Sequence, residues 1–315
     1  MPRLGGKRLL IAAAAVGILF WGAWRLLRPV KDRTAELLGR LPADQALHLY
    51  IEMDALLASP AARPMFADVF ARHPDWETLA SQVDAVAVSL GESEIFLVLS
   101  GVFPEPLIAA WLADIGADCP ASPSEDACSL PFRSASGMFS LRLLDGETLA
   151  LADSPHPQAV NRLAPLTSRS ASGLAGRARA RLNAGAFAWM NVDAPLLADA
   201  MREPPKDWIN LSLVARALIG ADRSAFSLAD TGEASSGGSL LIGLEAECKD
   251  EAAAAELQDV LGSLNKMARG ALGMDGEPDP DWLAVVDSFG TETAGGRVSA
   301  SWRIDSALLR VRGSE

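Results

Sequence analysis

The 315-residue sequence is poor in the residue types that most often carry chemistry. It has three cysteines, three histidines and one tyrosine. Three cysteines are too few for a disulfide-rich scaffold, and none of their spacings resembles the ligand spacing of a zinc site. The sequence also lacks the Gly-x-Ser-x-Gly and Walker-type Gly-Lys-Ser/Thr motifs. It therefore offers no recognisable hydrolase elbow and no phosphate-binding loop.

Positive charge is scarce outside the N-terminus. Residues 1–33 hold seven Lys and Arg but one acidic residue, which leaves 21 basic and 39 acidic residues, a net charge of −18, in the rest. Such a body repels nucleic-acid phosphates and anionic headgroups. Nucleic acid is therefore not expected as a partner, whereas a basic protein surface or a cation is compatible. With half of its residues apolar, the chain has the composition of a folded protein of about two domains.

The three histidines do not form a recognisable catalytic set. His48 alternates with the apolar positions of a predicted strand, so it is expected on the opposite, solvated face. His73 precedes a proline at a helix end, and His156 lies between two prolines at a helix start. Each is interpreted as a surface or capping residue, although separate loops could bring one beside an acid. No catalytic residue and no cofactor is assigned.

Two of the cysteines, Cys119 and Cys128, lie close together in a Pro- and Ser-rich segment. In an oxidising compartment, a disulfide between them would close a short loop and stabilise the fold by about 2–3 kcal/mol. Two unpaired loop thiols are the alternative. Cys248 is left over and is expected to be a small buried residue.

The N-terminus contains a long uncharged run, Leu9-Leu-Ile-Ala-Ala-Ala-Ala-Val-Gly-Ile-Leu-Phe-Trp-Gly-Ala-Trp24, preceded by basic residues. At 1.5 Å per residue it covers about 24 Å, and Leu26 and Leu27 extend it if the flanking arginines snorkel. Residues 9–28 are therefore predicted to be a transmembrane signal anchor, with residues 1–8 as a cytoplasmic tail. A cleaved signal peptide is the alternative, but the run is not followed by the small residues that cleavage requires.

The flanking charges, the length of the N-terminal tail and the cysteine pair bear on the orientation of the chain in the membrane. Lys and Arg are almost equally numerous on the two flanks of the run, and by the positive-inside rule the count leans slightly against export. A short N-terminal tail before a large domain usually stays in the cytoplasm, and a cysteine pair fits an oxidising compartment. The chain is expected to be a single-pass protein of the inner (cytoplasmic) membrane, with its body in the periplasm or another extracytoplasmic space.

The region after the anchor contains two segments with the same order of predicted elements. Each segment opens with an alternating strand, at 47–54 and 186–193, that runs into a helix. The Asp-Ala at this junction is followed in both segments by a Leu pair. In each, two strands, a helix and a closing strand follow. These lie at 85–90, 94–100, 105–115 and 138–143 in the first segment and at 224–229, 239–247, 250–271 and 298–304 in the second.

The shared order, β-α-β-β-α-β, predicts an α+β fold with two tandem ferredoxin-like-type halves that have antiparallel sheets. The first half is expected at 34–166 and the second at 181–315. Residues 167–180 are rich in Ser, Gly and Arg and fit a linker. One continuous domain with a long curved sheet is the alternative.

The first half also resembles a type of uncharacterised, membrane-anchored bacterial protein. The resemblance is carried by Leu41-Pro42-Ala43-Asp44, by Val83-Asp84-Ala85-Val86 followed by Leu97-Val98-Leu99-Ser100-Gly101-Val102-Phe103, and by Leu144-Asp145-Gly146 followed by Thr148-Leu149-Ala150-Leu151-Ala152. It implies no activity and assigns no functional residue.

One acidic segment is a candidate for a metal site. Asp275, Glu277, Asp279 and Asp281 stand at every second position, and Ca²⁺ takes six to eight oxygen ligands. The spacing differs from that of an EF-hand loop, and two prolines stiffen the segment. A solvated acidic turn that caps a helix at 281–286 is the preferred interpretation.

Four tryptophans bear on the choice between core and interface. Trp111, Trp208 and Trp282 fall in predicted helices, where tryptophan more often belongs to the core than to a partner contact. Trp189 lies on the first strand of the second half and could occupy either face. Two tryptophans exposed together would indicate an interface.

These features predict a membrane-anchored, non-catalytic exported protein that binds or scaffolds a protein partner in the cell envelope. It would contact the lipid bilayer through residues 9–28. The alternative is a ligand-binding or enzymatic domain with its site between the two halves, since crevices between domains are common ligand sites. A deep cleft lined by Asp, Glu, His or Arg would favour that alternative.

Overall fold

The computed structural model describes residues 33–63, 71, 81–91, 93–133, 137–163, 171–193, 195–196, 218, 220–231, 238–272 and 279–309. The chain divides into two units, Met1–Arg33 and Thr34–Glu315, and the sheet belongs to the second. The predicted anchor at 9–28 lies outside the described residues, as do His73 and Trp208. Within the described ranges, no helix combines the length and the apolar character that crossing a bilayer requires.

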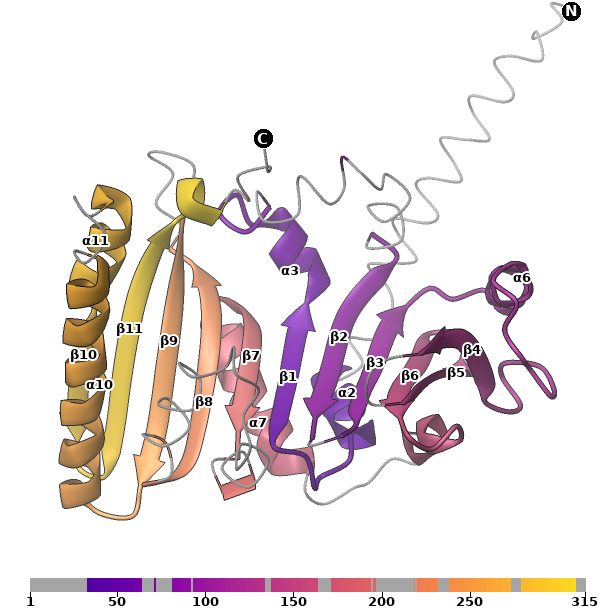
Figure 1. Cartoon of the computed structure of the whole chain (residues 1–315), viewed down its shortest axis with the longest axis horizontal. Helices are drawn as coiled ribbons and strands as arrows, with labels where there is room; N and C mark the ends of the chain where they lie inside the picture. Colours follow the sequence, from indigo (N-terminus) through magenta and orange to yellow (C-terminus); the bar gives the residue numbers. More distant parts are fainter. Residues whose placement is uncertain are drawn as a thin grey trace, which may run out of the picture. The chain divides into compact units, whose positions relative to one another are not determined.

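The described part of the chain contains eleven strands and several helices (Figure 1). The strands are β1 (Leu47–Glu52), β2 (Val83–Leu90), β3 (Ile95–Gly101), β4 (Cys128–Arg133), β5 (Met138–Asp145), β6 (Thr148–Ser154), β7 (Ala186–Val192), β8 (Ala221–Asp230), β9 (Ser239–Cys248), β10 (Gly290–Ala294) and β11 (Arg297–Asp305). The helices are α2 (Arg33–Arg40), α3 (Met53–Ala58), α6 (Glu105–Asp114), α7 (Ala171–Asn183), α10 (Glu251–Leu272) and α11 (Pro280–Asp287), with short 3-10 helices η1 (Ala159–Leu163) and η3 (Ser306–Leu309).

All eleven strands belong to one antiparallel sheet, in the order β10-β11-β9-β8-β7-β1-β2-β3-β6-β5-β4. The fold is therefore α+β with a large antiparallel sheet, and separate ferredoxin-like halves are not confirmed. β1 pairs with β7 from Leu47 to Ile51, so the strands of the two segments are continuous through hydrogen bonds. A single long sheet was the alternative prediction from the sequence.

The connectivity of the sheet repeats itself. Outward from the β1/β7 pair, the order is β1-β2-β3-β6-β5 on one side and β7-β8-β9-β11-β10 on the other, and β4 is an addition to the first segment. A helix precedes the first strand (α2, α7), another follows the third (α6, α10), and a 3-10 helix follows the last hairpin (η1, η3). Tyr50 and Trp189 hold the same position in the two repeats and pair directly with each other. An approximate two-fold axis therefore passes through this pair.

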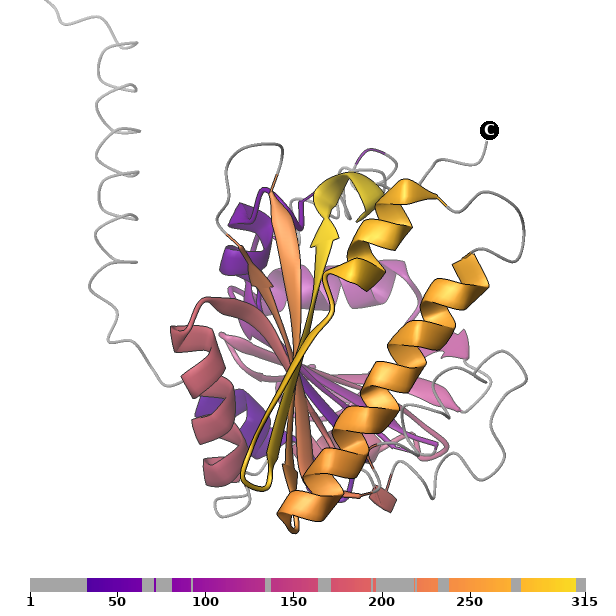
Figure 2. The same ribbon diagram turned by 90° about the vertical axis from the view of Figure 1, so that its left-hand side faces the viewer.

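The two faces of the sheet are covered differently. Because directly paired residues point to the same side, Tyr50, Ala87 and Trp189 define one face, which we call the Trp189 face. In the first half, α2 and η1 pack on this face, and α7 packs beside Trp189. On the opposite face, α10 covers the second half through Leu257 and Leu261. Figure 2 shows α7 and α10 on opposite sides of the sheet.

A helix occupies most of the segment that was expected to be a linker. Ala171–Asn183 forms α7, whose Ala175 and Ala178 are buried in the same apolar cluster as Trp189. The glycines and arginines that suggested a linker include Gly176 and Arg179, which lie on the exposed side of this helix. Small alanines on its other side let α7 approach the sheet closely.

Candidate interaction surface

Helix α6 begins and ends at signals in its own sequence. Pro106 stands in its first turn, where a missing N–H costs little. At its end, the N–H of Gly116 donates to the carbonyl of Ala113 at 3.2 Å, and the N–H of Ala117 donates to that of Leu112 at 2.9 Å. Gly116 has a φ of +73°, the left-handed conformation that this Schellman motif places on glycine. The helix therefore has defined boundaries that do not depend on deep burial.

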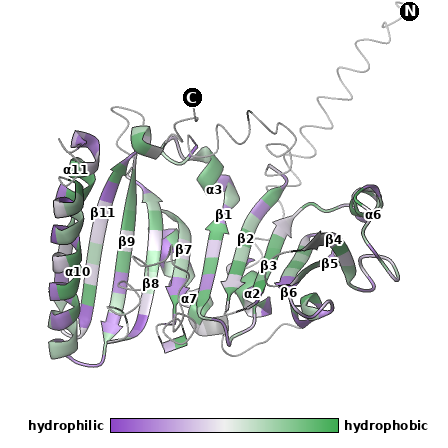
Figure 3. Ribbon diagram, viewed as in Figure 1, coloured by the Kyte–Doolittle hydropathy of each residue, from purple (hydrophilic) through white to green (hydrophobic). Residues whose placement is uncertain are grey.

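The surface of α6 is apolar and largely exposed. Seven of its ten residues are Ala, Leu, Ile or Trp (Figure 3). Of these ten, Leu112 is the buried one, packed in a cluster with Phe103 and other side chains of the opposite face. Leu107 is 64% exposed and Trp111 45%, and Val102, just before the helix, is 48% exposed. We call Leu107 and Trp111 the α6 patch, because residues four apart lie on the same side of a helix.

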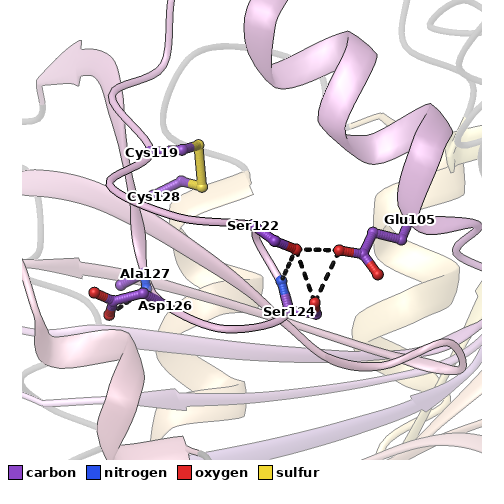
Figure 4. Close-up of a disulfide and its surroundings, with 7 residues drawn as sticks. All are labelled: Glu105, Cys119, Ser122, Ser124, Asp126, Ala127 and Cys128. Atoms are coloured by element: carbon purple, nitrogen blue, oxygen red, sulfur yellow. Dashed lines mark hydrogen bonds between the residues drawn. A yellow bond between two sulfur atoms is a disulfide. The ribbon is translucent and has the colours of Figure 1, made fainter.

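The loop after α6 is tied back to the start of the helix (Figure 4). Cys119 and Cys128 form a disulfide, with their Cα atoms 4.3 Å apart. The Glu105 carboxylate accepts hydrogen bonds from the hydroxyls of Ser122 and Ser124, the latter at 2.8 Å. These bonds favour the charged carboxylate and so lower the pKa of Glu105. The exposed helix is thus held to a cross-linked loop.

The tryptophans do not follow the expected assignment to the core. Trp111 and Trp282 are 45% and 43% exposed, so that expectation is wrong for both, whereas Trp189 is 1% exposed. The physical reason at α6 is that the helix meets the sheet mainly through Leu112, which leaves the Trp111 side without a covering layer. Trp282 belongs to α11, which packs on β11 at the other end of the sheet (Figure 1). The two exposed tryptophans therefore belong to separate surfaces.

A second group of polar side chains is buried between the two halves of the sheet. His48 was expected on a solvated face but is 3% exposed, because α2 and α7 cover the Trp189 face at this point. Its Nε2 lies 2.9 Å from the carbonyl of Pro42. Ser89 and Asn191 flank it on the neighbouring strands, and Arg177 of α7 donates to Asn191 Oδ1 at 3.1 Å.

Among the described residues, no acid forms a hydrogen bond with His48. Burial lowers the pKa of His48, against the raising effects of the hydrogen bond to Pro42 and of the charges of Asp193 and Asp44. These carboxylates act on His48 through charge, and no described residue hydrogen-bonds its Nδ1. Ser89 Oγ is likewise buried without a hydrogen-bond partner among the described residues. The lowered pKa favours the neutral imidazole, and no acid of the described part of the chain orients it.

Of the acidic candidates at 275–281, Asp279 and Asp281 are described, and both belong to the start of α11. Asp279 caps α11, since its carboxylate accepts from the N–H of Asp281 at 3.0 Å. Asp275 and Glu277 lie outside the described residues. Among the residues that are described, no three His, Cys, Asp or Glu are grouped so that they could hold a metal ion.

His156 and Cys248 complete the set of sequence candidates. His156 is exposed beside the end of β6. Cys248 is a free, half-buried thiol whose pKa is raised by burial and by Asp222 and Asp250. A thiol with a raised pKa is a poor nucleophile.

The chain has distant structural similarity to solved proteins. No family model matches the chain, and no curated protein matches it in sequence. The chain is similar to crystal form I of TP0453, with 9% identity and a TM-score of 0.49 over 87% of this chain and 94% of that chain. It is similar to crystal forms IV and III of TP0453 at 10% identity and a TM-score of 0.47, over 88% and 87% of this chain and 96% of each of those chains. Identity this low carries no information on function.

Proposed function

We propose that this chain is an exported, membrane-anchored protein without catalytic activity, and that it binds a protein partner through the α6 patch. The observation that carries the proposal is the exposure of Leu107 and Trp111 on a helix with defined ends. Clustered apolar side chains that stay exposed are typical of partner-binding surfaces. Tryptophan is also enriched among the residues that dominate binding energy.

The other parts of the proposal rest on the sequence. The apolar run at 9–28 would anchor the chain in the inner membrane, and the acidic body would lie in the extracytoplasmic space, where a disulfide such as Cys119–Cys128 persists. We infer that the body arose by duplication of a β-α-β-β-α-β unit of ferredoxin-like type. The repeated strand order on either side of the β1/β7 pair supports this origin.

The proposal is tested by crosslinking in cells and purification of the full-length chain in mild detergent. The wild type is compared with Leu107→Ser/Trp111→Ser and with a control, Met267→Ser/Trp282→Ser, which removes two equally exposed apolar residues elsewhere. The wild type and the control should recover the same stoichiometric partner, and the α6 variant should recover about tenfold less. Equal recovery with all three proteins, or repeated recovery of the chain alone, would contradict the proposal.

A second candidate function is a small-ligand or enzymatic site between the two halves. One observation favours it: His48 Nδ1 and Ser89 Oγ are both buried without a hydrogen-bond partner among the described residues, at the junction of β1 with β7 and β2. Buried unpaired polar atoms commonly mark a bound water or a functional site. A thermal-shift screen of small polar molecules should then give stabilisation that His48→Gln and Ser89→Ala each abolish. No stabilising compound, or stabilisation that survives both substitutions, would remove this candidate.

A further inference from the structure

The sequence around the α6 patch carries charge of one sign. From residue 73 to residue 132 there are ten Asp and Glu and no Lys or Arg. This 60-residue stretch includes β2, β3, α6 and the disulfide loop. An apolar patch within such a stretch favours partners that bring positive charge.

Two carboxylates follow the patch closely in the sequence. Asp114 ends α6 and Asp118 follows shortly after, and both are exposed. Among the described residues, no ion pair involves either of them. These two acids therefore remain available to charges from outside the chain.

Asp114 also lies where the dipole of its own helix disfavours a negative charge. The C-terminal end of a helix carries partial negative charge, which favours Lys or Arg and disfavours Asp. α6 has no basic residue in its last turn. Residues that are locally unfavourable, such as an acid at a helix C-terminus with no basic residue in the last turn, are expected at functional sites. A cation supplied by a partner would compensate both Asp114 and the helix end.

We propose that the α6 patch receives a protein segment that combines an apolar face with flanking lysines or arginines. This inference rests on the proposed function and narrows the class of partner. Leu107 and Trp111 would contact the apolar face, and Asp114 and Asp118 would pair with the basic residues. Anionic lipid headgroups are disfavoured because these acids repel them. A second copy of the chain is disfavoured because it would set one acidic rim against another.

The test uses the full-length protein in phosphatidylcholine nanodiscs and two synthetic probes. One probe is an amphipathic helical peptide of leucine and lysine, about 18 residues long, and the other replaces each lysine with glutamate. The variants are Asp114→Lys/Asp118→Lys, the milder Asp114→Asn/Asp118→Asn, and a control with the same change of charge on α10, Glu256→Lys/Asp259→Lys. Both α10 residues are exposed. Circular dichroism and Tm establish that each variant is folded.

The leucine–lysine peptide should bind the wild type and the α10 control with similar affinity. Its affinity for Asp114→Lys/Asp118→Lys should fall about tenfold or more, with the Asn variant between the two. The leucine–glutamate peptide should bind the wild type weakly and gain affinity for the lysine variant. Binding of the first peptide should also weaken as salt is added, because exposed charge pairs are screened.

Three results would overturn the inference. The first is equal loss of peptide binding in the α6 and α10 variants, which would mean a general effect of net charge. The second is binding to phosphatidylcholine vesicles but to neither peptide. The third is self-association that Leu107→Ser/Trp111→Ser abolishes.

The inference and the proposed function fail in different ways. If Leu107→Ser/Trp111→Ser loses the cellular partner while Asp114→Lys/Asp118→Lys keeps it, the patch binds a protein but not through cations. If neither variant changes partner recovery, the proposed function fails as well.

Discussion

At the residue scale, His48 couples protonation to folding. Burial lowers its pKa in the folded protein, so the unfolded chain binds a proton more tightly. The stability that neutral His48 contributes is complete above its ordinary pKa of about 6.5 and declines as the pH falls below that value, by at most about 1.4 kcal/mol per pH unit. His48→Gln retains a donor for the Pro42 carbonyl but does not titrate.

The corresponding measurement is urea unfolding of both proteins at about pH 7.5 and about pH 5.5. The wild type should lose more unfolding free energy between the two pH values than His48→Gln does. Equal losses would show that His48 is not the group responsible.

Trp189 and Trp111 provide a matched pair of large-to-small substitutions. Trp189 is 1% exposed in the cluster between the halves, whereas Trp111 is 45% exposed. Trp189→Ala should lower the unfolding free energy by about 3–5 kcal/mol, because it removes buried area and leaves a cavity. Trp111→Ala should change it by about 0.5 kcal/mol or less. Chemical denaturation measures both, and a similar cost at the two positions would show that the α6 patch is part of the core.

The positions of His48 and Trp111 could not be predicted from their local patterns. Alternation correctly placed His48 on one side of β1, away from Leu49 and Ile51, but the burial of that side depends on α2 and α7. The helix that contains Trp111 was predicted correctly. Trp111 is exposed because this helix contacts the sheet mainly through Leu112. In both cases the local sequence did not show whether a distant element covers the residue.

At the scale of elements, the disulfide next to α6 has a measurable effect. Cys119 and Cys128 are nine positions apart, and closing a loop of this length should stabilise the fold by about 2–3 kcal/mol. Adding reductant should lower the unfolding free energy of the wild type by this amount and leave Cys119→Ala/Cys128→Ala unchanged. If reductant also lowered the unfolding free energy of the double variant, the loss of stability would not come from this disulfide.

Strands were easier to predict from the sequence than irregular elements. The strand predicted at 85–90 corresponds to β2, a mostly apolar run that alternates between buried and half-buried residues in the structure. β4 was missed because it follows a Pro- and Ser-rich loop and contains a proline, which an edge strand tolerates. α7 was missed because glycines and arginines on its exposed side concealed the buried alanines.

At the scale of the whole body, the repeated element order was visible in the sequence but the joining of the two sheets was not. Strand pairing between β1 and β7 depends on backbone hydrogen bonds that carry little residue-specific signal. The nearest indication of this pairing in the sequence was that Tyr50 and Trp189 occupy matching positions in the two segments. Equivalent residues of two repeats meet at a two-fold axis. Because the two segments are joined through their first strands, they form one sheet with a shared core at the junction.

This shared core predicts that neither half folds alone. The apolar cluster combines Tyr50 and α2 of the first half with Trp189 and α7 of the second. A fragment of residues 34–166 would expose this apolar surface and would turn β1 into an edge strand with unpaired backbone groups from Leu47 to Ile51. A fragment of residues 167–315 would do the same to β7.

Each fragment should therefore show a non-cooperative thermal transition and weak protection of its amides from hydrogen exchange. An equimolar mixture should recover cooperative unfolding and protection in β1 and β7. Because the gain requires association, the Tm of the mixture should rise with concentration. Cooperative unfolding of either fragment by itself, independent of concentration, would show that the halves are autonomous domains and that the β1/β7 junction adds contact without being required for folding.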